Sequence, residues 1–171
     1  MRWLKGFDRR IFDFTLKLSQ ENLTHKLMWF VSRSGDLGVI WFCVCIVLLF
    51  LPGNRRIIEL CMITLLLTTI FSEGVLKKVI RRQRPHITHG LEALSIRMPT
   101  SFSFPSGHTA SAVACARILA AIGLQAAIPA YGYALLMAVS RVYLKVHYVT
   151  DVIAGGVLGY ACSEAVRWYF R

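Results

Sequence analysis

The chain has 171 residues, of which 56% are hydrophobic and 17% are charged. Soluble domains carry about 25% charged and about 45–50% apolar residues. This deficit of charge and the long apolar runs exclude an ordinary soluble enzyme and predict an integral membrane protein. The net charge of +11 is assigned to contacts with anionic lipid headgroups, so no nucleic acid partner is expected.

The first 26 residues predict an amphipathic N-terminal segment. Its apolar side chains recur at steps of three or four residues, with basic residues between them: Trp3, Leu4, Phe7, Ile11, Phe14 and Leu18. Such a helix can lie in the lipid headgroup layer as an interfacial element. It can equally pack as a short helix on the rest of the protein, and the sequence leaves both arrangements open.

Residues 27–171 predict one all-α domain, an integral membrane helical bundle of five to six spans. The apolar runs expected to cross the membrane are Leu37–Leu51 preceded by Leu27–Val31, Ile57–Leu76, Thr109–Ile122, Ile128–Leu144 and Val152–Trp168. The glycines at 155 and 159 have the GxxxG spacing that indicates close helix packing. All five cysteines lie in apolar runs without a CxxC pair, which argues against disulfides and a zinc site.

Residues 77–104 are polar, basic and interrupted by prolines, and they predict a loop. Counting spans places this loop and the turn at 145–150 on the same face of the membrane. Charge alone leaves the orientation open, because the positive-inside rule would put the basic loop in the cytoplasm unless its cations bind substrate.

The first segment with a candidate chemical role is 77–85. It holds five cations within eight residues: Lys77, Lys78, Arg81, Arg82 and Arg84. On a continuous helix Lys77 and Arg84 would share one face, two turns apart. Arginine offers a planar fork to phosphate oxygens, and lysine offers a point charge. The segment therefore predicts an anion-binding site, with a simple headgroup anchor as the alternative.

The second segment is 105–108, Pro-Ser-Gly-His, directly before an apolar run. A proline near a helix start, followed by Ser106 and Gly107, leaves backbone N–H groups free at the positive end of the helix dipole. A phosphate group binds well in that position, and His108 is then close to its oxygens. An ordinary interfacial histidine remains the alternative.

The third segment is 140–151, in which His147 and Asp151 lie four residues apart. One helical turn would bring the imidazole and the carboxylate together. A carboxylate that holds one ring nitrogen leaves the other free to act as a nucleophile or base. Arg141 adds a further cation, and a purely structural His–Asp pair is the alternative.

The three segments together resemble the signature of the type 2 phosphatidic acid phosphatase superfamily. The matching positions are Lys77-x6-Arg84-Pro85, Pro105-Ser106-Gly107-His108 and Ser140-Arg141-x5-His147-x3-Asp151. The resemblance covers about residues 71–160, and it is specific because three blocks match in order.

The resemblance implies a role for each matching position. His147 would attack phosphorus and form a phosphohistidine, oriented by Asp151, while His108 would act as the general acid and base. The nonbridging oxygens would be held by Lys77, Arg84, Ser106, Gly107 and Arg141. No metal or other cofactor is expected.

The resemblance also implies a function and a location. The chain would be a phosphatase acting on a membrane lipid phosphate or diphosphate, such as undecaprenyl diphosphate, phosphatidylglycerophosphate, phosphatidate or a lipid A phosphate. It would lie in the bacterial cytoplasmic membrane with its site on the outer face and without an obligatory protein partner. A lipid phosphotransferase using the same intermediate and a non-catalytic lipid-phosphate binder or transporter are the alternatives.

Overall fold

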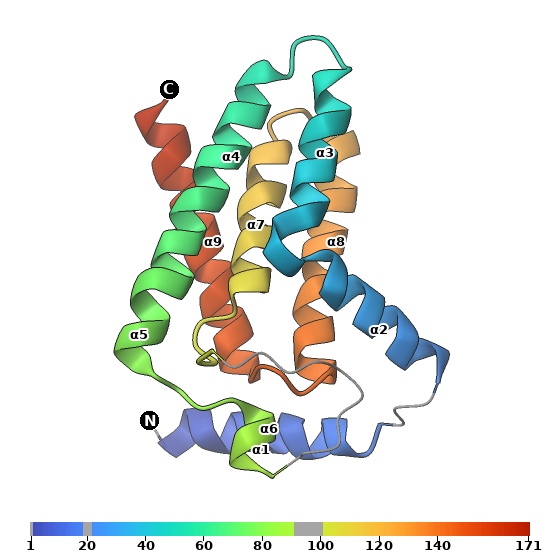
Figure 1. The fold of residues 1–171 in the computed structure, drawn as a ribbon, viewed down its shortest axis with the longest axis vertical. Coiled ribbons are helices and arrows are strands. Elements are labelled where there is room, and N and C mark those ends of the chain that lie inside the picture. The colour runs from blue at the N-terminus through green and yellow to red at the C-terminus, as the bar shows by residue number, and fades with distance from the viewer. Residues whose placement is uncertain (1, 19–21, 91–100) are drawn as a thin grey trace.

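The computed structural model describes residues 2–18, 22–90 and 101–171, and every regular element within these ranges is a helix. Five long helices form a bundle, with α7 (Gly107–Leu119) in its middle (Figure 1). The side chains of α7 are small and mostly buried, so neighbouring helices approach it closely. The predicted all-α fold is confirmed for the described residues.

Helix α1 (Arg2–Leu16) lies across one end of the bundle, nearly perpendicular to the long helices (Figure 1). Its inner face buries Phe12, whereas Phe7 and Phe14 on its outer face are exposed. Helix α1 therefore packs on the bundle, and its position in the lipid headgroup layer remains a prediction. Helix α2 begins at Leu23, so the boundary predicted at residue 26 falls inside that helix.

The first apolar run is broken rather than straight. Helix α2 (Leu23–Ser34), the short helix η1 (Asp36–Gly38) and helix α3 (Val39–Leu49) are bent by 58° at the junction. Leu37 and Gly38 both have positive φ angles, which end the first helix and redirect the chain.

The next helix is longer than the sequence predicts. Helix α4 (Arg55–Thr69) continues through a π-helical stretch, η2 (Ile70–Leu76), into α5 (Lys77–Ile80). A separate short helix, α6, covers Pro85–Thr88. The prediction of a loop from residue 77 is therefore wrong for these two segments. Lysine is a good helix former and continues the helix at 77–80, and Pro85 lies at the start of α6, where proline is tolerated. The predicted loop residues 91–100 lie outside the described ranges.

Helices α8 (Leu124–Tyr143) and α9 (Val149–Tyr169) complete the bundle. Helix α9 packs directly on α7, as the GxxxG pair predicts. A Cβ at Gly155 would lie 2.5 Å from the carbonyl oxygen of Ser106, and one at Gly159 would overlap the carbonyl oxygen of Ala110. Both glycines are therefore needed for this contact.

We expect Gly159→Ala to lower the free energy of unfolding by about 1–3 kcal/mol, because the added methyl group forces α7 and α9 apart. Gly156→Ala is the matched control, since a Cβ at Gly156 meets only Val113 Cγ2 at an ordinary 3.8 Å. Thermal unfolding of both variants in the same detergent measures the difference. Equal unfolding midpoints would contradict the account of this helix contact.

Two helical stretches, Arg55–Thr88 and Val149–Tyr169, are long and apolar enough to cross a membrane. The bent pair of α2 and α3 makes a third if it is counted as one span. These numbers apply to the described part of the chain, and the five to six spans expected from the sequence remain a prediction.

Candidate active site

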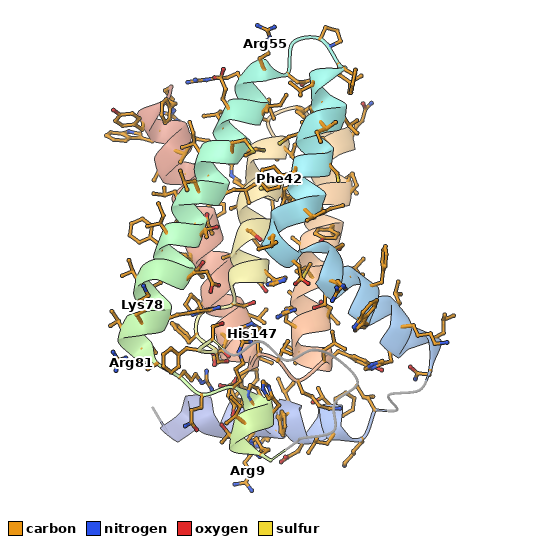
Figure 2. The ribbon with its side chains drawn as sticks, in the orientation of Figure 1. Arg9, Phe42, Arg55, Lys78, Arg81 and His147 are labelled. Atoms are coloured by element: carbon orange, nitrogen blue, oxygen red, sulfur yellow. The ribbon has the colours of Figure 1, made fainter. Side chains whose placement is uncertain are left out.

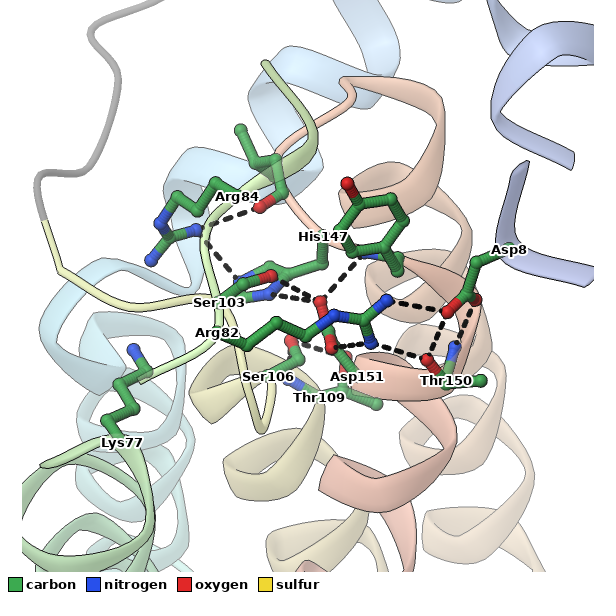
Figure 3. A network of polar contacts seen from close by, with 12 residues as sticks. Asp8, Lys77, Arg82, Arg84, Ser103, Ser106, Thr109, His147, Thr150 and Asp151 are labelled. Carbon is green, nitrogen blue, oxygen red and sulfur yellow. Dashed lines mark hydrogen bonds and ion pairs between the residues drawn. The ribbon is translucent and has the colours of Figure 1, made fainter. Parts of the chain in front are cut away.

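All three predicted segments lie at the end of the bundle that carries α1 (Figure 2). The backbone N–H of Ser106 donates to the carbonyl oxygen of Asp151 over 3.0 Å, which joins the second segment to the third. Arg84 of the first segment lies 3.2 Å from His147 of the third. The residues predicted from separate parts of the sequence therefore converge on one site, shown in Figure 3.

Lys77 enters the site from the end of the π-helical stretch and is buried. Its Nζ donates to Glu73 Oε1 over 2.6 Å, one turn earlier. The helix ends after Ile80 because Arg81 adopts a left-handed conformation with φ of 50°. The expectation that Lys77 and Arg84 share a helix face is wrong, and it is the turn of the chain after Ile80 that brings Arg84 back to the site.

Arg84 is the cation in direct contact with His147. Its Nε donates to the carbonyl oxygen of Ser101 over 2.6 Å, and its Nη1 donates to the carbonyl oxygen of Val146 over 2.9 Å. Nη1 also lies 3.2 Å from His147 Nε2. Because a guanidinium group can only donate, His147 Nε2 must be the unprotonated nitrogen, with its lone pair facing the cation.

Arg141 lies in the last turn of α8. Its side chain is buried, and Nη1 donates to Ser32 Oγ. Its Nε has no hydrogen-bond partner among the residues that the structure describes. A buried, unpaired guanidinium N–H next to two other buried cations is costly unless an anion joins it, so the arrangement fits a phosphate group.

The start of α7 lies against the helix that carries Lys77 and forms another side of the site. Ser106 is the N-cap residue, and its Oγ lies 3.0 Å from Thr109 Oγ1. Gly107 follows at the first helical position, where a Cβ would lie 2.5 Å from Glu73 Oε1. Glycine therefore lets this helix start approach the helix that carries Lys77. The free N–H groups of this first turn favour an anion.

His108 projects from the same helix start and pairs with an acid that the sequence analysis did not assign to the site. Its Nε2 lies 2.9 Å from Asp36 Oδ1, in the bend between α2 and α3. Gly35 makes this close approach possible, because a Cβ there would lie 2.9 Å from His108 Cδ2. A cavity of about 700 Å³, lined mainly by apolar residues of η1, α3 and α4, opens beside His108.

His147 and Asp151 do not share a helical turn, since α9 begins only at Val149. His147 Nδ1 nevertheless faces the carboxylate, at 3.7 Å from Asp151 Oδ2, and Nδ1 has no closer hydrogen-bond partner. Asp151 is fully buried, and Oδ2 accepts from the backbone N–H of Tyr148 over 2.9 Å and from Ser103 Oγ. A small movement of the imidazole would complete the hydrogen bond.

The pKa of His147 is lowered well below its ordinary value of 6.5, first by burial and then by the charges of Arg141, Arg84 and Lys77. The direction follows because both desolvation and nearby cations disfavour the imidazolium form. His147 is therefore neutral at physiological pH and has a lone pair available for nucleophilic attack.

Three polar residues of the site were missed by the sequence analysis: Ser103, which contacts Asp151; Arg82, which lies 2.7 Å from Asp151 Oδ1; and Asp36. Arg82 was visible as one of five cations, but nothing in the spacing distinguished it from its neighbours. Asp36 had a signal, since an acid flanked by glycines within an apolar run is expensive without a role.

The described residues contain no group of three histidine, cysteine, aspartate or glutamate side chains that could hold a metal ion. His86 and His89, which follow the first segment with HxxH spacing, have other contacts. His86 is buried in α6, and the His89 ring stacks on Phe12 of α1 with centroids 4.2 Å apart.

Residues 58–171 match the family model described as PAP2 superfamily. An undecaprenyl-diphosphatase of Sulfolobus acidocaldarius is 31% identical over 160 residues, which cover 90% of this chain and 74% of that protein. A decaprenylphosphoryl-5-phosphoribose phosphatase of Mycolicibacterium smegmatis is 44% identical over 84 residues, which cover 47% of this chain and 43% of that protein.

The fold is similar to the crystal structure of a transmembrane PAP2 type phosphatidylglycerolphosphate phosphatase from Bacillus subtilis. The TM-score is 0.80 at 25% sequence identity, over 99% of this chain and 87% of that one. Together with the family match over 58–171 and the archaeal relative, this similarity establishes the family. The chain belongs to the PAP2 superfamily.

Proposed function

We propose that this protein is a metal-independent lipid phosphatase that works through a phosphohistidine on His147. The observation that carries the proposal is the convergence of three buried cations on that imidazole: Lys77, Arg84 and Arg141. Three buried cations around a neutral imidazole bind a phosphate dianion better than any neutral ligand. They also supply the positive charge that stabilises the transition state of phosphoryl transfer.

In the first step, the lone pair of His147 Nε2 attacks phosphorus while the bond from phosphorus to the lipid oxygen breaks. Arg84 now occupies that lone pair at 3.2 Å, and it moves onto a nonbridging oxygen when substrate binds. Asp151 accepts a hydrogen bond from Nδ1–H, which stays on the ring, and its negative charge stabilises the positive charge that develops there. His108 gives its proton to the leaving oxygen.

In the second step, water attacks the phosphohistidine and the P–N bond breaks. His108, now neutral, accepts a proton from this water, and inorganic phosphate leaves with His147 Nε2 restored. The hydrogen bond from His108 to Asp36 orients the ring for both proton transfers. No step consumes a cofactor.

The apolar cavity beside His108 supports a lipid as the substrate. Its volume of about 700 Å³ is suited to part of an acyl or prenyl chain, and His108 at its polar end would meet the oxygen that joins chain and phosphate. The names of the relatives agree in placing a phosphate on a long-chain lipid. We propose undecaprenyl diphosphate, phosphatidylglycerophosphate, phosphatidate and lipid A phosphate as the candidates.

We also propose that the protein lies in a bacterial cytoplasmic membrane with this site at the outer surface, as its likeness to small bacterial members of the family suggests. The C-terminus lies at the opposite end of the bundle from the site (Figure 1). A reporter fused to the C-terminus would then be found in the cytoplasm.

Purified protein in detergent with excess EDTA, given each of the four candidate lipids, tests the proposal. We expect phosphate release from at least one lipid at a rate that EDTA does not lower, and much slower release from the water-soluble ester glycerol 3-phosphate. Binding without turnover would instead identify a lipid-phosphate binder. Transfer of labelled phosphate to an added acceptor, with none released, would identify a phosphotransferase.

A further inference from the structure

Helix α1 contributes a buried acid to the back of the candidate site. Asp8 is 3% exposed although it lies on a helix rich in basic residues, and its neighbours Arg9 and Arg10 are exposed. Asp8 and His147 lie beside the same narrow gap, where α1 packs on the turn that precedes α9. A buried carboxylate is costly unless it is paired, so its partners indicate why it is there.

The first partner is Arg82, which forms a bridge between two carboxylates. Its Nη2 lies 2.7 Å from Asp8 Oδ2, and its Nη1 lies 2.7 Å from Asp151 Oδ1 (Figure 3). The guanidinium also lies over the ring of Tyr148, with Cζ 4.0 Å from the ring centroid. The planar fork of arginine suits this two-sided contact, and lysine could not reproduce it.

The second partner is the first turn of α9, the helix that carries Asp151. The backbone N–H of Thr150 donates to Asp8 Oδ1 over 3.0 Å, and Thr150 Oγ1 donates to Asp8 Oδ2 over 2.6 Å. An N–H group in the first turn of a helix has no partner within that helix. Asp8 therefore caps α9 from another part of the chain, with its negative charge at the positive end of the helix dipole.

We propose that Asp8 is a positioning residue for catalysis and that α1 is part of the catalytic unit. Asp8 holds Arg82 against Asp151 and fixes the first turn of α9, so the Asp151 carboxylate faces His147 Nδ1 in a set orientation. This inference rests on the proposed function and assigns a role to a helix that lies outside the family match at 58–171.

Arg82 has other anions within reach, which explains why Asp8 is needed to keep it in contact with Asp151. Arg82 is 26% exposed at its side chain and lies next to a site that binds anions. Without Asp8, the guanidinium could turn toward substrate phosphate or lipid headgroups, and Asp151 Oδ1 would lose its charge-assisted hydrogen bond. The carboxylate would then be held through Oδ2 alone, by Tyr148 N–H and Ser103 Oγ, and its orientation toward His147 would be less fixed.

The test is steady-state kinetics of the full-length protein with Asp8→Asn, which removes the charge but keeps the size of the side chain. We expect kcat to fall about tenfold, because the His147 imidazole is no longer held in line for attack. KM should change by less than about twofold, because the phosphate-binding cations are untouched. Asp13→Asn is the matched control, since Asp13 is an exposed acid on the same helix, and it should behave as wild type.

A second pair of variants separates positioning from folding. Arg82→Gln alone and together with Asp8→Asn should give the same kcat, since both substitutions break one chain of contacts. If Asp8→Asn does not fold, Arg82→Lys should show the same fall in kcat with unchanged KM. If the fold-losses in kcat of the two single variants multiplied in the double variant, this inference alone would be overturned. A wild-type kcat in Asp8→Asn would also overturn it. Wild-type protein without lipid phosphatase activity would overturn the proposed function, and this inference with it.

Discussion

His147→Ala is expected to reduce phosphate release from a lipid substrate by at least about 1,000-fold, because no other group in the site can take the place of the nucleophile. The structure supports this size of effect through the orientation of the ring. Nε2 lies 3.2 Å from Arg84 with its lone pair outward, and the low pKa of His147 keeps the ring neutral. The measurement is release of inorganic phosphate per folded protein.

The matched control is His25→Ala, a histidine in the first turn of α2 that is not part of the site. It should retain wild-type activity, and the unfolding midpoints of both variants should show that the protein remains folded. His147→Ala that releases phosphate at more than a tenth of the wild-type rate would rule out His147 as the nucleophile.

His108→Ala is expected to separate the two half-reactions. Turnover of a lipid substrate should fall by about 10²- to 10⁴-fold, because the leaving lipid oxygen is no longer protonated. An activated ester such as p-nitrophenyl phosphate has a leaving group that needs no proton. His108→Ala should therefore release one p-nitrophenol per protein in a rapid burst. Turnover should then be slow, because no general base assists hydrolysis of the phosphohistidine.

The amplitude of this burst is the quantity to measure, by stopped-flow absorbance. His147→Ala should show no burst, which serves as the control for an intermediate on that residue. A His108→Ala protein that hydrolyses lipid as fast as wild type, or that loses the burst along with lipid turnover, would contradict the assignment of His108 as the general acid.

The sequence allowed candidate site residues to be named, but it did not predict their geometry. Lys77, Arg84, His108, Arg141 and His147 carry side chains of the kinds expected to bind or attack phosphate, and the structure brings them close together. Their roles in catalysis remain a proposal. Counting the predicted spans was enough to place the three segments at one end of the bundle.

The local conformations were harder to predict, because they depend on contacts between distant segments. Nothing in the basic run shows that Arg81 turns left-handed and folds Arg84 back onto the site. The pairing of His108 with Asp36 depends on a bend in the first apolar run, where Gly35 gives the two segments room. Asp8 looked like one more charge on an amphipathic helix, and only the packed position of α1 reveals its partners.

The most direct test of the central claim is to locate the covalent intermediate. His108→Ala protein is mixed with ³²P-labelled p-nitrophenyl phosphate, whose leaving group needs no proton, and is then quenched in alkali, digested and mapped by mass spectrometry. The account predicts a label that is stable in alkali and labile in acid, attached to His147 and lost in the double variant with His147→Ala. A label on any other residue, or phosphate release from lipid with no labelled protein at any time, would contradict it.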